Sequence, residues 1–543
     1  MAYEMNSMKK ITNLLRLFYR FPAGERHKFL HNLLVHLQPK IKLDTSAHIV
    51  VQCVQDPFYL TLFAYITHAL RQRASVNVGL FVPQSINAAI GFNLRSIMLR
   101  SFPLNRLQIN KWVRLWDVVS TKIAYRSISL RYPLADIIDA WRSYCSWRKL
   151  VSPGDLEAIS IDDVPCGDLV IDSYLRFRPS PRVVVGDLFM LYVLWQAHRD
   201  VRRAQRYFRS KKPLLYITTY TTYVEHGIAA RVALQEGVRL VSFGNLQEFG
   251  KFHSRDDFFH TSNASSYLHN FNLLPDPSPL IEMARRQLEA RLAGGIDIAT
   301  SYMATPAYLK TTNEVPNVQD AVIVFLHDFY DSPHVYADLV FPDFWEWICF
   351  TLDTLRSAGI RCLFKPHPNQ IALSDKVIDE LRLRFPDMEL IEPEVTNRQL
   401  VDAGMACAVT VYGTVAHEMA YMGVPTIACA RHPHIAFDFC RTAKNRADYA
   451  DLLRDALAPV ISRELLRKQA LQFFVMHNLN YPPEQIQLRD ALIDAWKAFE
   501  DPLSDATKLV DHFENIVKLP YFSTLINNMI DDLVPTSLAE PEL

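Results

Sequence analysis

The segment Lys365-Pro366-His367-Pro368-Asn369 places a cation and an imidazole directly after the apolar run IRCLF. The two prolines fix the direction of the backbone, so we expect His367 to be held rigidly at the end of a strand. A cation and an imidazole at such a point suit a phosphate group. We therefore predict that Lys365, His367 and Pro368 bind a nucleotide. A loop histidine hydrogen-bonded to backbone is the alternative.

A second polar segment, Tyr412-Gly413-Thr414, follows the run ACAVTV and opens a predicted helix. The small Gly-Thr pair leaves backbone N–H groups pointing outward, and a helix N-terminus favours an anion. Glu418 lies one turn further on, within expected reach of a ribose or sugar hydroxyl. We predict that Tyr412, Gly413, Thr414 and Glu418 bind the nucleotide. The alternative is that Thr414 is only the N-cap of the helix.

The loop after the run AVIVFL holds two histidines and two aspartates within eight residues. Such a cluster is compatible with a metal ion, but Pro333 and the loop setting give no obvious ligand geometry. We predict instead that the loop contacts the substrate, and we expect no metal; plain loop structure is the alternative. The predicted substrate-binding residues in this loop are His327, Asp328, Asp331, Ser332 and His334.

Two segments of the N-terminal half carry the candidate catalytic carboxylates. Asp172 and Arg176 lie in GDLVIDSYLR, and Glu225 and His226 lie in TTYVEHG, directly after the run LLYITTY. A carboxylate at a cleft acts as general base on a hydroxyl or as nucleophile in a double displacement. We predict catalytic roles for Asp172, Glu225 and His226 and substrate contact for Arg176. An Asp172–Arg176 pair one turn apart, and helix capping by Glu225 and His226, are the alternatives.

The motifs KPHPN and VYGTVAHEMAYMGVPTI resemble the nucleotide-binding half of bacterial surface-carbohydrate transferases with the GT-B fold. That group includes capsule and O-antigen β-Kdo transferases, bacterial sialyltransferases and, more distantly, the CDP-glycerol glycerophosphotransferases. The resemblance covers most of residues 160–450, including GDLVIDSYLR, TTYVEHG and HDFYDSPHVYADLVFPDFWEW. It implies that His367 and Thr414 bind the donor phosphate. Many members have Ser where this chain has Gly413.

The resemblance also implies an activity. It predicts a metal-independent glycosyltransferase that moves a sugar, first of all Kdo from CMP-Kdo, to a growing bacterial surface polysaccharide or lipopolysaccharide. The partners would be a nucleotide-sugar donor and a glycan or lipid-linked glycan acceptor, with no cofactor beyond the donor. Two alternatives stay open. One is a CDP-glycerol-type glycerophosphotransferase, and the other is a non-catalytic GT-B scaffold of a capsule assembly complex.

Strand–helix–strand patterns in both halves of the chain position these motifs and predict an α/β protein. Two Rossmann-like domains with a cleft between them follow, and ligands of such sheets bind outside the carboxyl ends of the strands. Residues 250–320 show no clean strand pattern. The predicted parts are a basic helical segment (1–45), an acceptor and catalytic domain (46–260), a linker (261–318), a nucleotide-sugar-binding domain (319–460) and a helical region (461–543).

Charge and cysteine usage narrow the function classes. The chain has 58 Lys plus Arg and 58 Asp plus Glu, a balance that gives no support to a nucleic-acid partner. Its eight cysteines form no C-x-x-C pair and mostly lie in apolar runs, so we expect reduced thiols and a cytoplasmic location.

Residues 9–28 combine six Lys or Arg with leucines and phenylalanines. This pattern predicts peripheral contact with the inner face of the plasma membrane, although a helix docked on its own domain has the same pattern.

Overall fold

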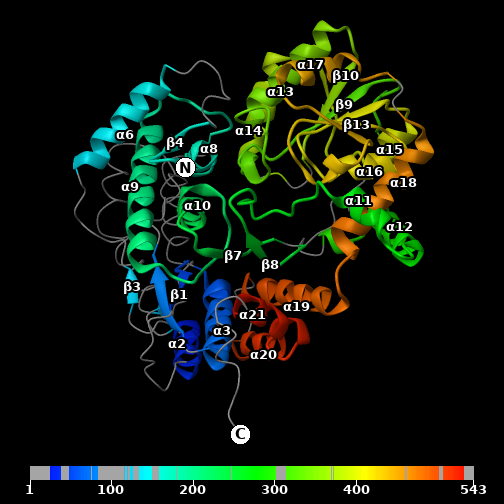
Figure 1. Ribbon diagram of the computed structural model, residues 1–543. Coiled ribbons are helices and arrows are strands. Elements are labelled where there is room, and N and C mark those ends of the chain that lie inside the picture. Colours follow the sequence, from blue (N-terminus) through cyan, green and yellow to red (C-terminus); the bar gives the residue numbers. More distant parts are fainter. Residues whose placement is uncertain are drawn as a thin grey trace, which may run out of the picture.

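The computed structural model describes residues 25–37, 48–82, 134–149, 158–300, 314–458, 461–500 and 506–530, with short pieces at 115–125. Seven single positions inside these ranges are not described: Gln55, Ser75, Pro179, Leu246, Pro368, Asn369 and Ile371. Two sheets, each flanked by helices, form two domains (Figure 1). The basic segment predicted at the N-terminus lies largely outside the described residues.

The first domain is built on a six-stranded sheet in the order β3-β2-β1-β6-β7-β8. All neighbours in it are parallel except β7 and β8, which are antiparallel. From β1 the chain moves outward to β2 and β3 and then returns to β6 on the other side, so the switch point lies between β1 and β6. The strands are β1 His48–Gln52, β2 Asn77–Phe81, β3 Ile123–Tyr125, β6 Leu215–Thr218, β7 Arg239–Phe243 and β8 Gly250–His253.

The second domain has a parallel six-stranded sheet in the order β11-β10-β9-β12-β13-β14. Here the chain goes from β9 to β10 and β11 and then returns to β12, which places the switch point between β9 and β12. The strands β9, β12 and β13 are buried throughout, as expected for a sheet covered on both faces. The strands are β9 Val322–Phe325, β10 Cys362–Lys365, β11 Glu389–Leu390, β12 Cys407–Val409, β13 Thr426–Ala428 and β14 Cys440–Thr442.

Helices cover both faces of each sheet, and their ends carry the expected signals. For example, Asp343 accepts a hydrogen bond from the backbone N–H of Glu346 at 2.7 Å and so caps the next helix. The helices of the first domain are α2 Glu25–His36, α3 Pro57–Arg73, α6 Leu134–Trp147, α8 Gly167–Phe177, α9 Leu188–Lys211, the π-helix η1 Tyr223–Gly227 and α10 Ile228–Gln235. Those that follow are α11 Tyr267–Asn272, α12 Ser278–Leu292, α13 Phe344–Ser357, α14 Ala372–Arg384, α15 Asn397–Asp402, α16 Val415–Met422 and α17 Arg446–Arg454.

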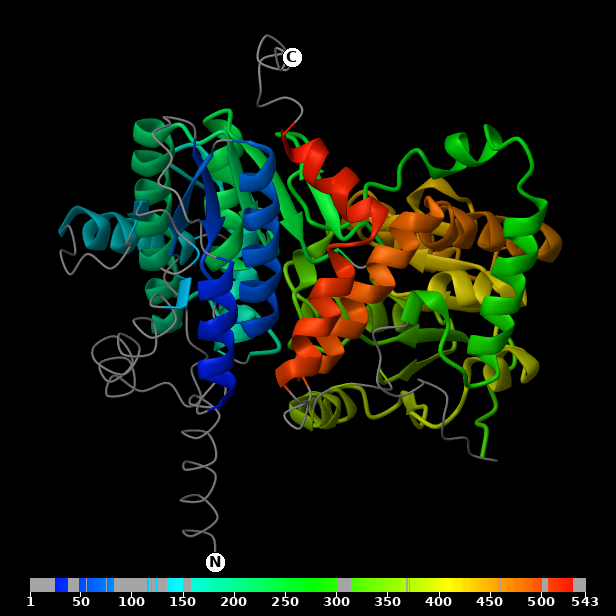
Figure 2. The same ribbon diagram turned by 90° about the horizontal axis from the view of Figure 1, so that it is seen from below.

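The last helices are shared between the two domains. Helix α18, Arg463–Phe474, packs on α16 and on α12 in the second domain. Helices α19 (Pro483–Glu500), α20 (Ala506–Ile516) and α21 (Pro520–Ile530) return to α3 of the first domain, where Leu492, Phe513 and Ile526 join its core (Figure 2). The helical region predicted at 461–543 therefore completes two existing cores.

The predicted strands and helices are confirmed at the positions that carry the motifs. The prediction that residues 250–320 contain no strand is wrong, because Gly250–His253 forms β8 at the sheet edge. That strand is short and contains Gly and Lys, which is typical of an edge. All eight cysteines are free thiols. None of the helices in the described ranges combines the length and apolar character needed to cross a bilayer.

Candidate functional site

The predicted nucleotide residues meet at the switch point of the second sheet. His327 follows β9, Lys365 and His367 lie at the end of β10, and Tyr412 to Thr414 follow β12. The His327 ring lies 4.7 Å from the ring of Tyr412 and stacks on Phe344 at 5.1 Å. Pro368 is outside the described residues. The prediction that these segments come together is therefore confirmed for all of them that the structure describes.

Gly413 is in close contact with its neighbours. A Cβ atom on Gly413 would lie 3.0 Å from Thr410 Oγ1 and 3.4 Å from His327 Nε2. The backbone N–H of Gly413 also donates to Thr410 Oγ1 at 3.2 Å. A serine at this position would therefore require Thr410 or His327 to shift by a few tenths of an ångström.

Burial lowers the pKa values of the basic groups at this switch point. The pKa of His327 falls to about 3, so the ring is neutral, with a smaller contribution from His367. Burial lowers the pKa of Lys365 to about 8, opposed by Glu418, and the ammonium donates to the Pro393 carbonyl at 3.2 Å. Burial also lowers the pKa of His367, while Asp328 opposes the change. A bound phosphate would raise the pKa values of these groups, because a nearby negative charge favours their protonated forms.

Arg291, on α12, is a site residue that the sequence motifs do not include. Its guanidinium pairs with Glu418 at 2.6 Å and donates to the hydroxyl of Thr414 at 3.1 Å. Glu418 also accepts from Asn397 at 2.8 Å, so the carboxylate is buried in a network and does not extend toward a ligand as predicted. Thr414 occupies the N-cap position of α16, as the alternative had it, but its side chain makes no capping bond. Arg291 also lies 3.6 Å from the buried carboxylate of Asp297, so its charge is balanced within the network and its contribution at the start of α16 is the bond to Thr414.

The loop from His327 to Val335 joins the two domains. Asp172, on α8, accepts from His334 Nδ1 at 2.6 Å and also from the backbone N–H of His334. Arg176, one turn further along α8, donates to the Tyr330 carbonyl at 3.1 Å. The Asp172–Arg176 pair considered from the sequence is therefore not formed. Asp172 lies within a helix and not at a strand end, and it is 1% exposed.

The other polar groups of this loop stabilise its own turn. Asp328 accepts from the backbone N–H of Tyr330 at 3.1 Å and from the Ser374 hydroxyl at 3.0 Å. Asp331 accepts from the backbone N–H of Ser332 at 2.9 Å, and burial raises its pKa. The Ser332 carbonyl accepts from Tyr412 at 3.0 Å. These bonds shape the segment that carries His334 to Asp172.

A polar network lies at the switch point of the first sheet. Gln52 ends β1, and its Nε2 donates to the Glu225 carbonyl at 3.2 Å. This bond fixes the amide orientation, so Oε1 accepts from the Thr218 hydroxyl at 2.6 Å and from His226 Nδ1 at 3.1 Å. His226 must then carry its proton on Nδ1 when neutral, and Nε2 keeps its lone pair. Burial lowers the pKa of His226, which favours this neutral form.

Glu225 and His226 lie on η1, directly after β6, as predicted. Both side chains are half-buried, in contrast to the buried Asp172. Among the described residues, no hydrogen-bond partner of His226 Nε2 is recorded, and this atom is not one of the fully buried polar atoms. His226 Nε2 therefore has the lone pair needed to accept a proton from a bound hydroxyl. No side-chain cap bond opens η1.

No protein-family model matches the chain, and neither does any curated protein sequence. Two doubly wound domains, with the last helices returning to the first domain, make this a GT-B fold. Similar solved structures include Thermosulfurimonas dismutans KpsC, a β-Kdo 2,4-transferase, with 12% identity and a TM-score of 0.28 over 45% of this chain and 79% of that one. The Methanocaldococcus jannaschii UDP-GlcNAc 2-epimerase has 10% identity and a TM-score of 0.24 over 78% and 97%.

A third similar structure is the spinosyn rhamnosyltransferase SpnG with thymidine diphosphate, at 11% identity and a TM-score of 0.23 over 83% of this chain and 100% of that one. TM-scores this low carry no argument about substrate or reaction. The functional proposal for the GT-B chain therefore depends on its own residues.

A buried histidine cluster lies behind α16 in the second domain. The backbone N–H of His434 donates to His432 Nδ1 at 3.0 Å, so neutral His432 carries its proton on Nε2 and donates to Thr442 at 2.9 Å. His434 Nδ1 lies 2.8 Å from the same His432 nitrogen, so its N–H shares the single lone pair of that nitrogen with the backbone N–H, and His434 Nε2 accepts from His417 at 3.2 Å.

The ligand atoms of His432, His434 and Cys440 lie within 4.8 Å of one another, which is close enough to raise the question of a metal ion. A metal needs lone pairs on the imidazole nitrogens that it binds. In the hydrogen-bond order above, His432 Nε2 and His434 Nδ1 both carry protons. The cluster therefore fits a neutral hydrogen-bonded chain better than a metal site.

The buried histidines of this region, His477 among them, predict that acid lowers the stability of the fold. Burial lowers the pKa of His432 to about 3 and that of His477 to about 4, both below the unfolded value near 6.5. The unfolded chain therefore binds protons first, so stability is full above about pH 6.5 and falls below it, by about 1.4 kcal/mol per pH unit for each histidine. We expect the difference in melting temperature between pH 7.5 and 5.5 to shrink in His477→Phe, which keeps the stacking on Phe473.

The exposed His269 supplies the control for this experiment, and His269→Gln should melt like wild type at both pH values. An unchanged pH dependence in His477→Phe would contradict the assignment of a depressed pKa to this ring.

Proposed function

We propose that this chain is a glycosyltransferase that moves a sugar from an activated nucleotide to a bacterial surface polysaccharide or lipopolysaccharide. One observation carries the proposal. The basic groups His367, Lys365 and Arg291 gather at the switch point of the second sheet, whereas the proton-accepting groups His226 and Glu225 lie at the switch point of the first. This division supplies a donor side and an acceptor side, which transfer between two substrates needs.

In the proposed reaction the second domain holds the donor. Lys365 and His367 contact the phosphate at the end of β10, and the backbone N–H groups at the start of α16 face the same anion. Arg291 keeps the Thr414 hydroxyl oriented by donating to its oxygen, which leaves the Thr414 proton available for a phosphate oxygen. Positive charge there stabilises the departing nucleotide as the glycosidic bond breaks.

The first domain binds the acceptor in this proposal. His226 Nε2 accepts the proton of the attacking hydroxyl, and Gln52 keeps the imidazole in the tautomer that can do so. Asp172 acts through His334, because its carboxylate is buried and bonded to that ring. We propose that the Asp172–His334 pair holds the loop from His327 to Val335 against the first domain during the reaction.

CMP-activated Kdo is our first choice of donor, on the basis of the KPHPN and YGT motifs. The test is a thermal-shift panel of CMP, CDP, UDP, GDP and CMP-sugars, because a ligand that binds the folded state raises its melting temperature. Transfer to a glycan acceptor, followed by mass spectrometry, then separates a sugar transferase from a glycerophosphotransferase, which would leave a phosphodiester in the product. No binding by any nucleotide in the panel would contradict the proposal and favour the scaffold alternative.

His367→Ala is expected to weaken nucleotide binding about tenfold to a hundredfold, because a contact with an ionised phosphate contributes about 1.5–3 kcal/mol. The measurement is calorimetric titration with the nucleotide that gives the largest thermal shift. His269→Ala removes an exposed imidazole and is the matched control. Unchanged nucleotide affinity in a folded His367→Ala protein would remove His367 from the donor site.

A further inference from the structure

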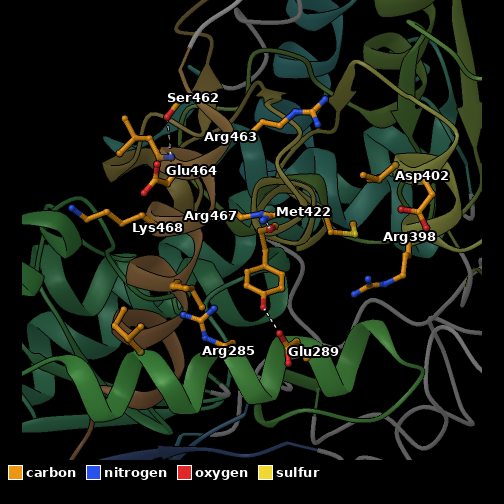
Figure 3. A pocket seen from close by; sticks show the side chains of 15 residues that line it. Arg285, Glu289, Arg398, Asp402, Met422, Ser462, Arg463, Glu464, Arg467 and Lys468 are labelled. Atoms are coloured by element: carbon orange, nitrogen blue, oxygen red, sulfur yellow. Dashed lines mark hydrogen bonds between the residues drawn. The ribbon is translucent and has the colours of Figure 1, made fainter.

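The second domain has a pocket on the side away from the donor residues. It has a volume of about 920 Å³ and is lined by residues of α12, α15, α18 and the C-terminal end of α16 (Figure 3). Tyr421 and Met422 line it, whereas Thr414 lies at the opposite end of α16. The eight residues of α16 correspond to about 12 Å of helix rise, so the pocket is separate from the donor switch point.

The lining of this pocket carries more positive than negative charge. Five basic side chains line it, against three acidic ones: Arg285, Arg398, Arg463, Arg467 and Lys468, and Glu289, Asp402 and Glu464. Among the described residues, Arg398, Arg463 and Lys468 have no recorded ion pair. These side chains are exposed to solvent, and the excess of five basic over three acidic groups gives the lining a net positive charge that attracts an anion.

Two of these cations are held on one side of the pocket. Arg398, from α15, and Arg463, from α18, lie on the same side with Met422 between them, whereas Glu464 and Lys468 point to the other side (Figure 3). The stem of Arg463 packs on Gly423, where an added Cβ would lie 3.4 Å from the Cβ and Cγ of Arg463. Gly423 has a φ of 89°, which favours glycine at the end of α16.

The mixture of charges indicates the kind of ligand. Guanidinium groups bind carboxylates through paired hydrogen bonds, and the carboxylates of Glu289, Asp402 and Glu464 can accept bonds from hydroxyls. A nucleic-acid site would be uniformly basic. Sugars that carry both hydroxyl and carboxylate groups fit interleaved donors and acceptors. We propose that this pocket binds a carboxylate-bearing glycan chain, as a second site for the acidic polymer that the proposed transferase extends.

Helix α12 connects the pocket to the donor site. Glu289 accepts from the Tyr421 hydroxyl at 2.8 Å in the pocket, and Arg291, two residues later, pairs with Glu418 beside Thr414. Arg467 adds a bond from its Nε to the Tyr421 carbonyl at 3.1 Å. A chain bound here therefore rests on the same two helices, α12 and α16, that orient the donor residues. Keeping the polymer on the enzyme between transfers is the function that this placement allows.

The test measures binding of an oligogalacturonate, a carboxylated oligosaccharide, to the full chain at physiological salt. The double variant Arg398→Gln, Arg463→Gln is expected to bind the oligogalacturonate about tenfold more weakly than wild type. The matched control, Lys376→Gln with Arg382→Gln, removes two exposed cations of α14 and should bind like wild type. An uncharged maltooligosaccharide of equal length should not bind to this pocket.

Three results would overturn the site: no binding by wild type, equal weakening in both double variants, or competition by CMP, which would place the glycan at the donor switch point. The inference rests on the proposed function in one respect only: that function identifies the bound glycan as the polymer that the enzyme extends. Binding that depends on Arg398 and Arg463 in a chain without transferase activity would keep the site and reject the proposed function. Binding together with transfer should give shorter products from the arginine double variant.

Discussion

Asp172→Asn is expected to lower sugar transfer about a hundredfold, the cost of misplacing a reacting group by about 1 Å, while nucleotide binding stays nearly intact. The carboxylate accepts from both the ring and the backbone N–H of His334 across the domain interface. Asparagine keeps the shape but offers one oxygen in place of two, and it removes the charge that faces the imidazole. The donor groups lie in the other domain, so nucleotide affinity measures whether the fold is preserved.

The control for Asp172→Asn is Asp163→Asn, an exposed carboxylate of the same domain. Glu225→Gln tests the second predicted carboxylate in the same assay. If Asp172 acts by holding the loop, His334→Gln should lose as much transfer as Asp172→Asn, and the double variant should lose little more. Near-normal transfer by both Asp172→Asn and Glu225→Gln would remove these residues from the mechanism and leave the Asp328–Asp331 loop as the next region to test.

The sequence was sufficient to predict which polar segments follow buried strands. Runs such as AVIVFL and ACAVTV are long enough and apolar enough to be buried strands, and the polar residues that follow them must then lie at one sheet edge. This reasoning brought His327, His367 and Thr414 together correctly. The edge strand β8 was not predicted, because it has only four residues, and its glycine and lysine have low β-propensity.

The pairing partners could not be predicted, because they come from segments far apart in the chain. Arg291 lies in a charged helix whose sequence resembles any exposed helix, and only packing against α16 shows that it is buried beside Glu418. Asp172 reads equally well as a partner of Arg176, and only the domain arrangement selects His334. Gln52 ends an apolar strand and gives no functional signal until the fold brings η1 beside it.

His226→Gln is expected to lower transfer about a hundredfold to ten-thousandfold, the range for losing a general base. A glutamine side chain cannot take up the proton of an attacking hydroxyl. Because burial lowers the pKa of His226, the wild-type enzyme should keep its activity down to a pH below the ordinary histidine value near 6.5. Nucleotide affinity should not change, since His226 lies on η1 in the other domain.

Gln52→Glu gives this assignment a signature that a structural role would not produce. The new carboxylate would still accept from Thr218 and from His226 Nδ1, but its charge would stabilise the imidazolium and raise the pKa of His226. The neutral form of His226 would then be lost at a higher pH. The fall in rate on the acidic side of the pH profile should therefore shift to higher pH, with most activity recovered at alkaline pH. Gln52→Leu, which removes the anchor without adding charge, should lower the rate at every pH instead. If the rate of Gln52→Glu falls at the same acidic pH as that of wild type, His226 is not the base. This conclusion would hold even if His226→Gln had lost most of its transfer activity.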